Sequence, residues 1–118
     1  MARILIIDDE EYIRSAVRST LSDGGHEIRE ANDGESGLRM FRESRPDLVI
    51  TDIMMPGKGG LEVIPEMREA DSEVKIIAMS ALGYDALPKA IELGANHTFV
   101  LPFDPRALVE AVERLLGE

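Results

Sequence analysis

Three short apolar runs constrain the fold of this chain more than any other feature of its sequence. They cover residues 4–7, 48–50 and 76–79 and contain only Ile, Leu, Val, Ala and Met. A strand that is apolar at every position buries both of its faces, as strands do in a parallel sheet with helices on each side. The runs therefore predict three central strands of such a sheet.

Acidic or hydroxyl-bearing residues follow each of these runs. Asp8 and Asp9 follow the first, Asp52 follows the second, and Ser80 follows the third. In open parallel sheets, ligands bind outside the carboxyl ends of the strands. We therefore expect these four side chains to meet at one edge of one sheet and to form a functional site there.

Patterns typical of helices separate the predicted strands. Apolar residues recur at helical spacing over residues 13–21, and further helices are predicted over 61–70 and 85–93. Asp33 is a suitable N-cap for a helix to about Arg42, and Asp104 is one for the last helix. Pro65 predicts that its helix either starts late or bends, because proline removes a helical hydrogen bond.

Two further strands, residues 26–31 and 98–101, complete five strand–helix units in one domain over 1–118. Residues 27–30 alternate between polar and apolar, which suits a half-exposed edge strand. Because crossovers between parallel strands are right-handed, an edge position for the second strand favours the order 2-1-3-4-5.

The composition excludes several classes of function. The chain has no cysteine, so disulfides, thiolate metal sites and cysteine nucleophiles are excluded. The net charge is −10, from 23 acidic and 13 basic residues without a basic cluster, so we do not expect direct binding of nucleic acid. No apolar stretch approaches the roughly 18 residues of a membrane span. We expect a cytoplasmic protein with no membrane partner.

The three aspartates suggest a particular chemistry. Taken singly, each is typical of a turn or a helix cap, but their convergence at the ends of buried strands favours a functional site. Carboxylates crowded together either take up a proton or are neutralised by a cation. A few carboxylates completed by water and phosphate suit Mg²⁺ better than Ca²⁺. One aspartate could also act as a nucleophile toward phosphorus and form an acyl phosphate.

The motifs around these residues point to a family. They are Asp-Asp-Glu at 8–10, Asp-Ile-Met-Met-Pro-Gly at 52–57, Ser-Ala at 80–81, Gly-Ala at 94–95 and Pro-Phe at 102–103. With them the chain resembles the receiver domains of two-component response regulators, chemotaxis regulators among them, over essentially its whole length. The resemblance implies a flavodoxin-like α/β fold, a five-stranded parallel sheet with helices on both faces. Its strand order is also 2-1-3-4-5, so the resemblance and the order are not independent.

The resemblance also implies a function. A histidine kinase or phosphotransfer protein would transfer a phosphoryl group to Asp52. Asp9, Asp52 and the backbone carbonyl of Met54 would bind Mg²⁺, with Asp8 acting through a water. Ser80 would hydrogen-bond the phosphoryl oxygen and report to a downstream protein through the surface of the fourth helix, fifth strand and fifth helix. At most, the domain would catalyse its own phosphorylation and dephosphorylation.

Two positions depart from the family pattern. Leu101 stands where the family usually carries a lysine that contacts the acyl phosphate, and Thr98 stands where it carries a Tyr or Phe switch. Losing a charged hydrogen bond costs on the order of 1.5–3 kcal/mol, so we expect weak switching. Lys58 is a substitute charge or, as we favour, a solvated loop lysine. The peptide bond before Pro102 is expected to be cis.

Two alternatives to a phosphoacceptor remain open. One is a degenerate receiver that binds partner proteins without needing phosphate, which the departures from the family pattern would suit. The other is a flavin mononucleotide protein, which is disfavoured because residues 8–11 are all acidic. A phosphate-binding loop at that place would be rich in Gly, Ser and Thr.

Overall fold

Five parallel strands form a single sheet in the computed structural model, which describes residues 2–81 and 86–117. The order is β2-β1-β3-β4-β5, as predicted. The strands are β1 (Arg3–Ile7), β2 (Glu27–Ala31), β3 (Leu48–Asp52), β4 (Lys75–Ser80) and β5 (His97–Val100). Because β2 lies at one edge, its alternating sequence correctly predicted an edge strand.

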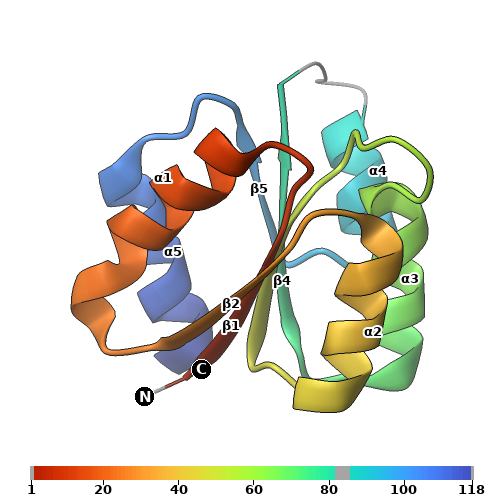
Figure 1. Cartoon of the computed structure of the whole chain (residues 1–118), viewed down its shortest axis with the longest axis horizontal. Coiled ribbons are helices and arrows are strands. Elements are labelled where there is room, and N and C mark those ends of the chain that lie inside the picture. The colour runs from red at the N-terminus through yellow and green to blue at the C-terminus, as the bar shows by residue number, and fades with distance from the viewer. Residues whose placement is uncertain (1, 82–85, 118) are drawn as a thin grey trace.

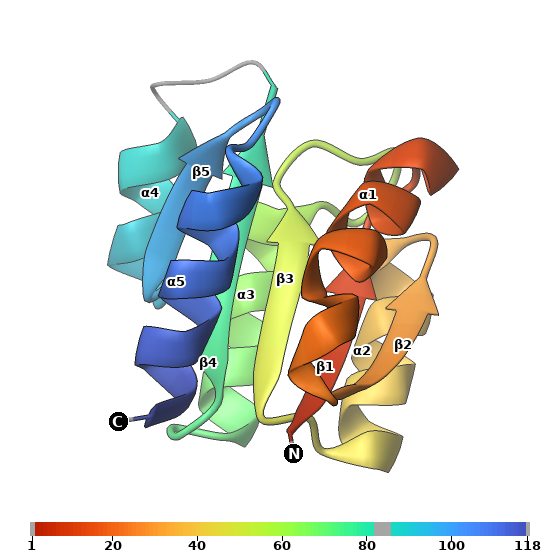
Figure 2. The same ribbon diagram turned by 90° about the vertical axis from the view of Figure 1, so that its left-hand side faces the viewer.

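Helices cover both faces of this sheet (Figure 1). On one face lie α1 (Glu11–Leu21) and α5 (Pro105–Gly117), which Figure 2 shows in front of the strands. On the other face lie α2 (Gly34–Ser44), α3 (Gly60–Ala70) and α4 (Ala86–Leu93). A 3-10 turn (Ser22–Gly24) follows α1. None of the helices in the described part of the chain is long and apolar enough to cross a membrane.

The central strands are buried on both faces, as their apolar sequences predicted. In β1, Ile4 and Ile6 pack into the cluster beneath α1 and α5, while Leu5 and Ile7 pack into the cluster beneath α2, α3 and α4. All four of these side chains are at most 1% exposed. The sheet is therefore packed between two apolar layers, and this packing fixes where the carboxyl ends of its strands lie.

Most helix ends agree with the sequence. The Asp33 carboxylate accepts a hydrogen bond from the backbone N–H of Ser36 at 2.8 Å, and that of Asp104 accepts one from Arg106 at 3.1 Å. The helix α3 begins at Gly60 and continues through Pro65, so a late start is wrong. Asp85, predicted as the first residue of α4, lies outside the described residues.

Two glycines allow the loop after β3 to pack closely. A Cβ atom on Gly60 would lie 2.5 Å from the carbonyl oxygen of Asp52. A Cβ atom on Gly34, at the start of α2, would clash with the carbonyl oxygen of Lys58. Because only glycine fits at these two places, the loop from β3 lies directly against the starts of α2 and α3.

Arg68 of α3 joins several segments at the edge of the sheet where the strands begin. Its guanidinium donates to the carbonyl oxygens of Val74 at 2.6 Å and Gly94 at 2.8 Å. It also donates to the carbonyl oxygen of Ser72 and to Oδ1 of Asn96, both at 3.0 Å. At the same edge β1 begins and α5 ends, so both ends of the described chain lie there (Figure 2).

Candidate functional site

Three carboxylates meet at the opposite edge of the sheet, where the strands end. Asp8 and Asp9 directly follow β1, and Asp52 is the last residue of the neighbouring strand β3. One carboxylate oxygen from each lies within 4.8 Å of the others. Asp8 is buried, Asp52 is half-buried and Asp9 is exposed. The structure therefore brings together the three aspartates that the strand ends predicted.

The acidic cluster, by which we mean Asp8, Asp9 and Asp52, is electrostatically unfavourable without a counter-charge. Burial raises the pKa of the Asp8 carboxyl from its usual 3.8 to about 7, against a backbone hydrogen bond from Glu10, and the charges of Asp52 and Asp9 raise it further. Burial and the charge of Asp9 likewise raise the pKa of Asp52. A set of close carboxylate oxygens with surplus negative charge fits a hard divalent cation such as Mg²⁺.

Asp8 and Asp52 also each form a local turn. Oδ1 of Asp8 accepts a hydrogen bond from the N–H of Glu10 at 2.9 Å, and Oδ1 of Asp52 accepts one from the N–H of Met54 at 3.1 Å. Such turns are common where Asp side chains bind the main chain two residues on. The turn interpretation and the functional interpretation of these residues are thus compatible. The turn at Asp52 also places the Met54 main chain beside the acidic cluster.

On the other side of β3, Ser80 is the last residue of β4 and Leu101 directly follows β5. Ser80 is fully buried, and its carbonyl oxygen accepts a hydrogen bond from the N–H of Leu101 at 2.9 Å. The Leu101–Pro102 peptide bond is cis, which confirms that prediction. A cavity of about 220 Å³ lies here, and its lining includes Asp52, Leu101 and Tyr12. Leu101 thus presents an apolar side chain to the space beside Asp52.

Lys58 does not bring its positive charge to the cavity beside Asp52, and Thr98 has no aromatic ring. The Lys58 ammonium group forms an ion pair with Glu66 of α3 at 2.5 Å, and Glu66 also pairs with Arg42. A lysine held in this way does not supply a substitute charge beside Asp52, and it is paired with Glu66 and not solvated, in contrast to the interpretation that we favour from the sequence. Thr98 is half-buried in the edge strand β5, opposite Ala78 of β4.

The sequence did not identify Arg14 as part of the site. Its Nη1 atom donates to the carbonyl oxygen of Asp8 at 2.7 Å. A signal was available, because residue 14 falls with Ile13 and Val17 on the face of α1 that turns to the sheet, where an apolar residue is expected. A charged residue at such a position indicates a specific polar partner.

A parallel sheet with an aspartate cluster at its carboxyl edge is the arrangement of a signalling receiver, and comparison with known proteins agrees. Residues 4–113 match the response regulator receiver domain. The chain is 36% identical to protein CcdB of Bacillus subtilis, with 99% of each chain covered. It is also 36% identical to the chemotaxis protein CheY of Thermotoga maritima, with 96% of each covered. The chain therefore belongs to the response regulator receiver family.

Solved structures agree with this assignment. The receiver domain of NtrX from Brucella abortus superposes with a TM-score of 0.91 at 35% identity, over 97% of this chain and 98% of that one. A receiver domain protein from Clostridium thermocellum superposes with a TM-score of 0.93 at 29% identity, over 99% and 95%. The similarity thus extends over the whole fold, including the edge that carries the acidic cluster.

Proposed function

We propose that this receiver accepts a phosphoryl group on Asp52 from a phosphohistidine of a histidine kinase or phosphotransfer protein. The observation that supports the proposal is the convergence of Asp8, Asp9 and Asp52 within 4.8 Å at the carboxyl edge of the sheet. Both buried members have raised pKa values, so the cluster favours a ligand that brings positive charge. An interaction module that needed no phosphate would gain nothing from burying the Asp8 carboxylate and half-burying that of Asp52.

In the proposed reaction, a carboxylate oxygen of Asp52 attacks the phosphorus atom and forms an O–P bond. The P–N bond to the histidine breaks, and its electron pair stays on the imidazole nitrogen. Asp9, Asp52 and the Met54 carbonyl would hold Mg²⁺, with Asp8 acting through a water, and the metal would offset negative charge on the transferred group. The Ser80 hydroxyl would donate a hydrogen bond to a phosphoryl oxygen.

Phosphorylation can be tested with a small donor. Incubation with acetyl phosphate and Mg²⁺ should add the mass of one phosphoryl group to the wild-type protein and none to Asp52→Asn. The matched control is Asp23→Asn, an exposed aspartate in the turn after α1, which should be labelled like the wild type. A label that persists in Asp52→Asn would identify another acceptor and refute the assignment.

We further propose that phosphorylation changes the distal surface of α4, β5 and α5 only weakly. Leu101 places no ammonium group in the cavity beside Asp52, and Thr98 is too small to move as a ring does. Amide shifts on adding beryllofluoride should spread further in Leu101→Lys than in the wild type. The control Val100→Lys puts the same charge one residue away, on a side chain that is 40% exposed, and should not widen the spread of the shifts that beryllofluoride causes. Full wild-type shifts that the Leu101→Lys change does not enlarge would contradict the proposal.

The second candidate is a receiver that binds its partner without phosphate. Leu101, the apolar residue in the cavity beside Asp52, favours this candidate. So do the exposed apolar side chains of Ile91 on α4 and Val100 on β5. The mass measurement separates the two candidates, because a degenerate receiver would remain unlabelled with Mg²⁺ and acetyl phosphate.

A further inference from the structure

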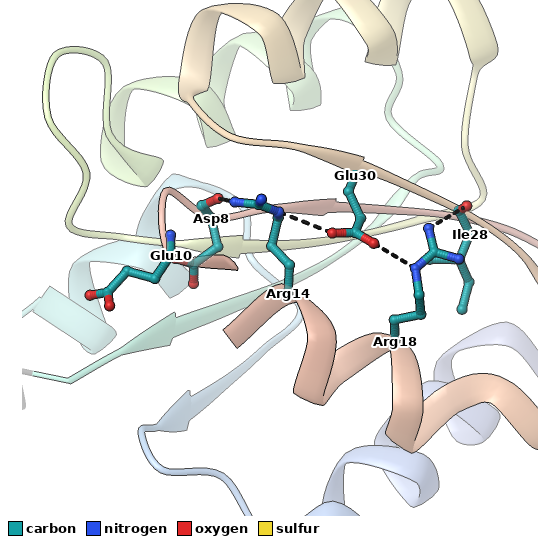
Figure 3. A network of polar contacts seen from close by, with 6 residues as sticks. All are labelled: Asp8, Glu10, Arg14, Arg18, Ile28 and Glu30. Carbon is teal, nitrogen blue, oxygen red and sulfur yellow. Dashed lines mark hydrogen bonds and ion pairs between the residues drawn. The ribbon is translucent and has the colours of Figure 1, made fainter. Parts of the chain in front are cut away.

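Arg14 of α1 contacts the main chain of the acidic cluster and not its carboxylates. The side chain is only 14% exposed. Its Nη1 atom donates to the carbonyl oxygen of Asp8 at 2.7 Å, while Nε donates to Oε1 of Glu30 at 3.0 Å (Figure 3). The Asp8 carbonyl lies just beyond the last residue of β1. A buried carbonyl without a donor is costly, and here the guanidinium supplies the donor.

The main chain at Asp8 is held on both sides. Its N–H donates to the carbonyl oxygen of Ala31 in β2 at 3.1 Å, and its side chain accepts from the Glu10 N–H at 2.9 Å. Asp9 is different: it is exposed, and within the described residues its side chain makes no hydrogen bond or ion pair. The position of the Asp9 carboxylate therefore depends on the peptide group that it shares with Asp8.

Glu30 is shared between Arg14 and Arg18. This carboxylate of β2 also accepts from Nε of Arg18 at 2.5 Å, and Arg18 in turn donates to the carbonyl oxygen of Ile28 at 3.0 Å (Figure 3). The hydrogen bond from Arg18 and, less strongly, the one from Arg14 lower the pKa of Glu30, so it is ionised at neutral pH. Because Arg14 pairs with Glu30 and bonds only the main-chain carbonyl of Asp8, it forms no ion pair with the carboxylates of the acidic cluster.

We propose that Arg14 is a positioning residue for divalent-cation binding and phosphorylation. Held by Glu30, it fixes the peptide group between Asp8 and Asp9, so that both carboxylates converge on Asp52. The inference rests on the proposed function, since it assigns to Arg14 the geometry of the site that would bind Mg²⁺. Outer residues that orient metal ligands in this way typically change metal affinity about 10–100-fold when they are removed.

The decisive comparison is between Arg14→Met and Arg18→Met. Each variant removes one positive charge and one hydrogen bond to Glu30, but only Arg14 contacts Asp8. Electrostatics alone predicts that either loss strengthens Mg²⁺ binding, because the surroundings of the cluster become more negative. We expect calorimetry to show about 10-fold weaker binding in Arg14→Met and equal or tighter binding in Arg18→Met. Equal affinities in the two variants would overturn the proposal.

Two further measurements keep the proposal testable if Arg14→Met fails to fold or if no Mg²⁺ binds. Arg14→Lys keeps the charge and the aliphatic stem, so it should fold, yet its compact ammonium cannot reproduce the two-pronged contact. It should bind Mg²⁺ more weakly than the wild type, and equal binding would count against the proposal. Without metal, the Glu10 amide should exchange its hydrogen faster in Arg14→Met than in Arg18→Met. If the wild type binds no Mg²⁺, the proposed metal role fails, and this exchange alone decides whether Arg14 positions the turn.

Discussion

Arg68 should be among the most important residues for the stability of this domain. Arg68→Met keeps most of the aliphatic stem but removes every donor to Val74, Ser72, Gly94 and Asn96. These acceptors come from the connection between α3 and β4 and from the connection between α4 and β5. Because the guanidinium ties both connections to α3, its loss should loosen one whole edge of the sheet.

The magnitude follows from the acceptors. The carbonyls of Val74 and Gly94 are partly buried, and a hydrogen bond from a charged group contributes about 1.5–3 kcal/mol. The contacts with Ser72 and Asn96 are exposed, so water replaces the lost donor there. Burial lowers the pKa of Arg68, which shows that desolvation of the guanidinium opposes part of the gain. We therefore expect a loss of about 3–4 kcal/mol, near the lower end of the summed range.

Urea unfolding followed by circular dichroism measures this loss. The control is Arg42→Met, because Arg42 is 59% exposed and makes one ion pair with Glu66 at 3.4 Å. An exposed pair of this kind contributes at most about 1 kcal/mol. Arg68→Met should still be phosphorylated at low temperature, because Asp52 lies at the other edge. A loss no greater than that of Arg42→Met would refute the reasoning.

Three further predictions concern other parts of the fold. Gly34→Ala forces a Cβ atom against the Lys58 carbonyl, and urea unfolding should show a loss of about 1–3 kcal/mol, whereas a neutral result would mean that the loop yields freely. With metal removed by EDTA, the contribution of Asp8 to wild-type stability should be fully present below its usual pKa of 3.8 and should be lost as pH rises through about 7, because the folded state binds the proton more tightly. Asp8→Asn should flatten this loss, whose slope is at most about 1.4 kcal/mol per pH unit, and an unchanged profile would assign it to other groups. Asp33→Ala removes the acceptor for the Ser36 N–H and should lower the urea midpoint, Asp33→Ser should restore most of it, and equal midpoints would show that the cap is dispensable.

Local features of the sequence were enough to predict the framework of this domain. The buried strands, the edge strand β2 and the caps at Asp33 and Asp104 each depend on burial or on hydrogen bonds over a few residues. The meeting of Asp8 with Asp52 also follows from local information, because the ends of neighbouring parallel strands share one edge.

Contacts between distant segments were beyond such reasoning. The helix α3 begins at Gly60 and continues through Pro65, and Gly60 lies closer to the Asp52 carbonyl than any residue with a Cβ atom could. Similarly, the pairing of Arg14 with Glu30 joins residues 16 positions apart. It depends on β2 lying beside β1, so it becomes visible only once α1 is packed on that part of the sheet.

The positions of the two chain ends have a practical consequence for handling this protein. The start of β1 and the end of α5 lie at the edge of the sheet remote from the acidic cluster (Figure 2). A purification tag, a fluorescent reporter or a surface linker joined at either end would therefore stand away from Asp52 and leave room for a bulky phosphodonor. Chains immobilised through either end would present the acidic cluster away from the sensor surface, so donor binding could be measured without a special method of orienting the protein.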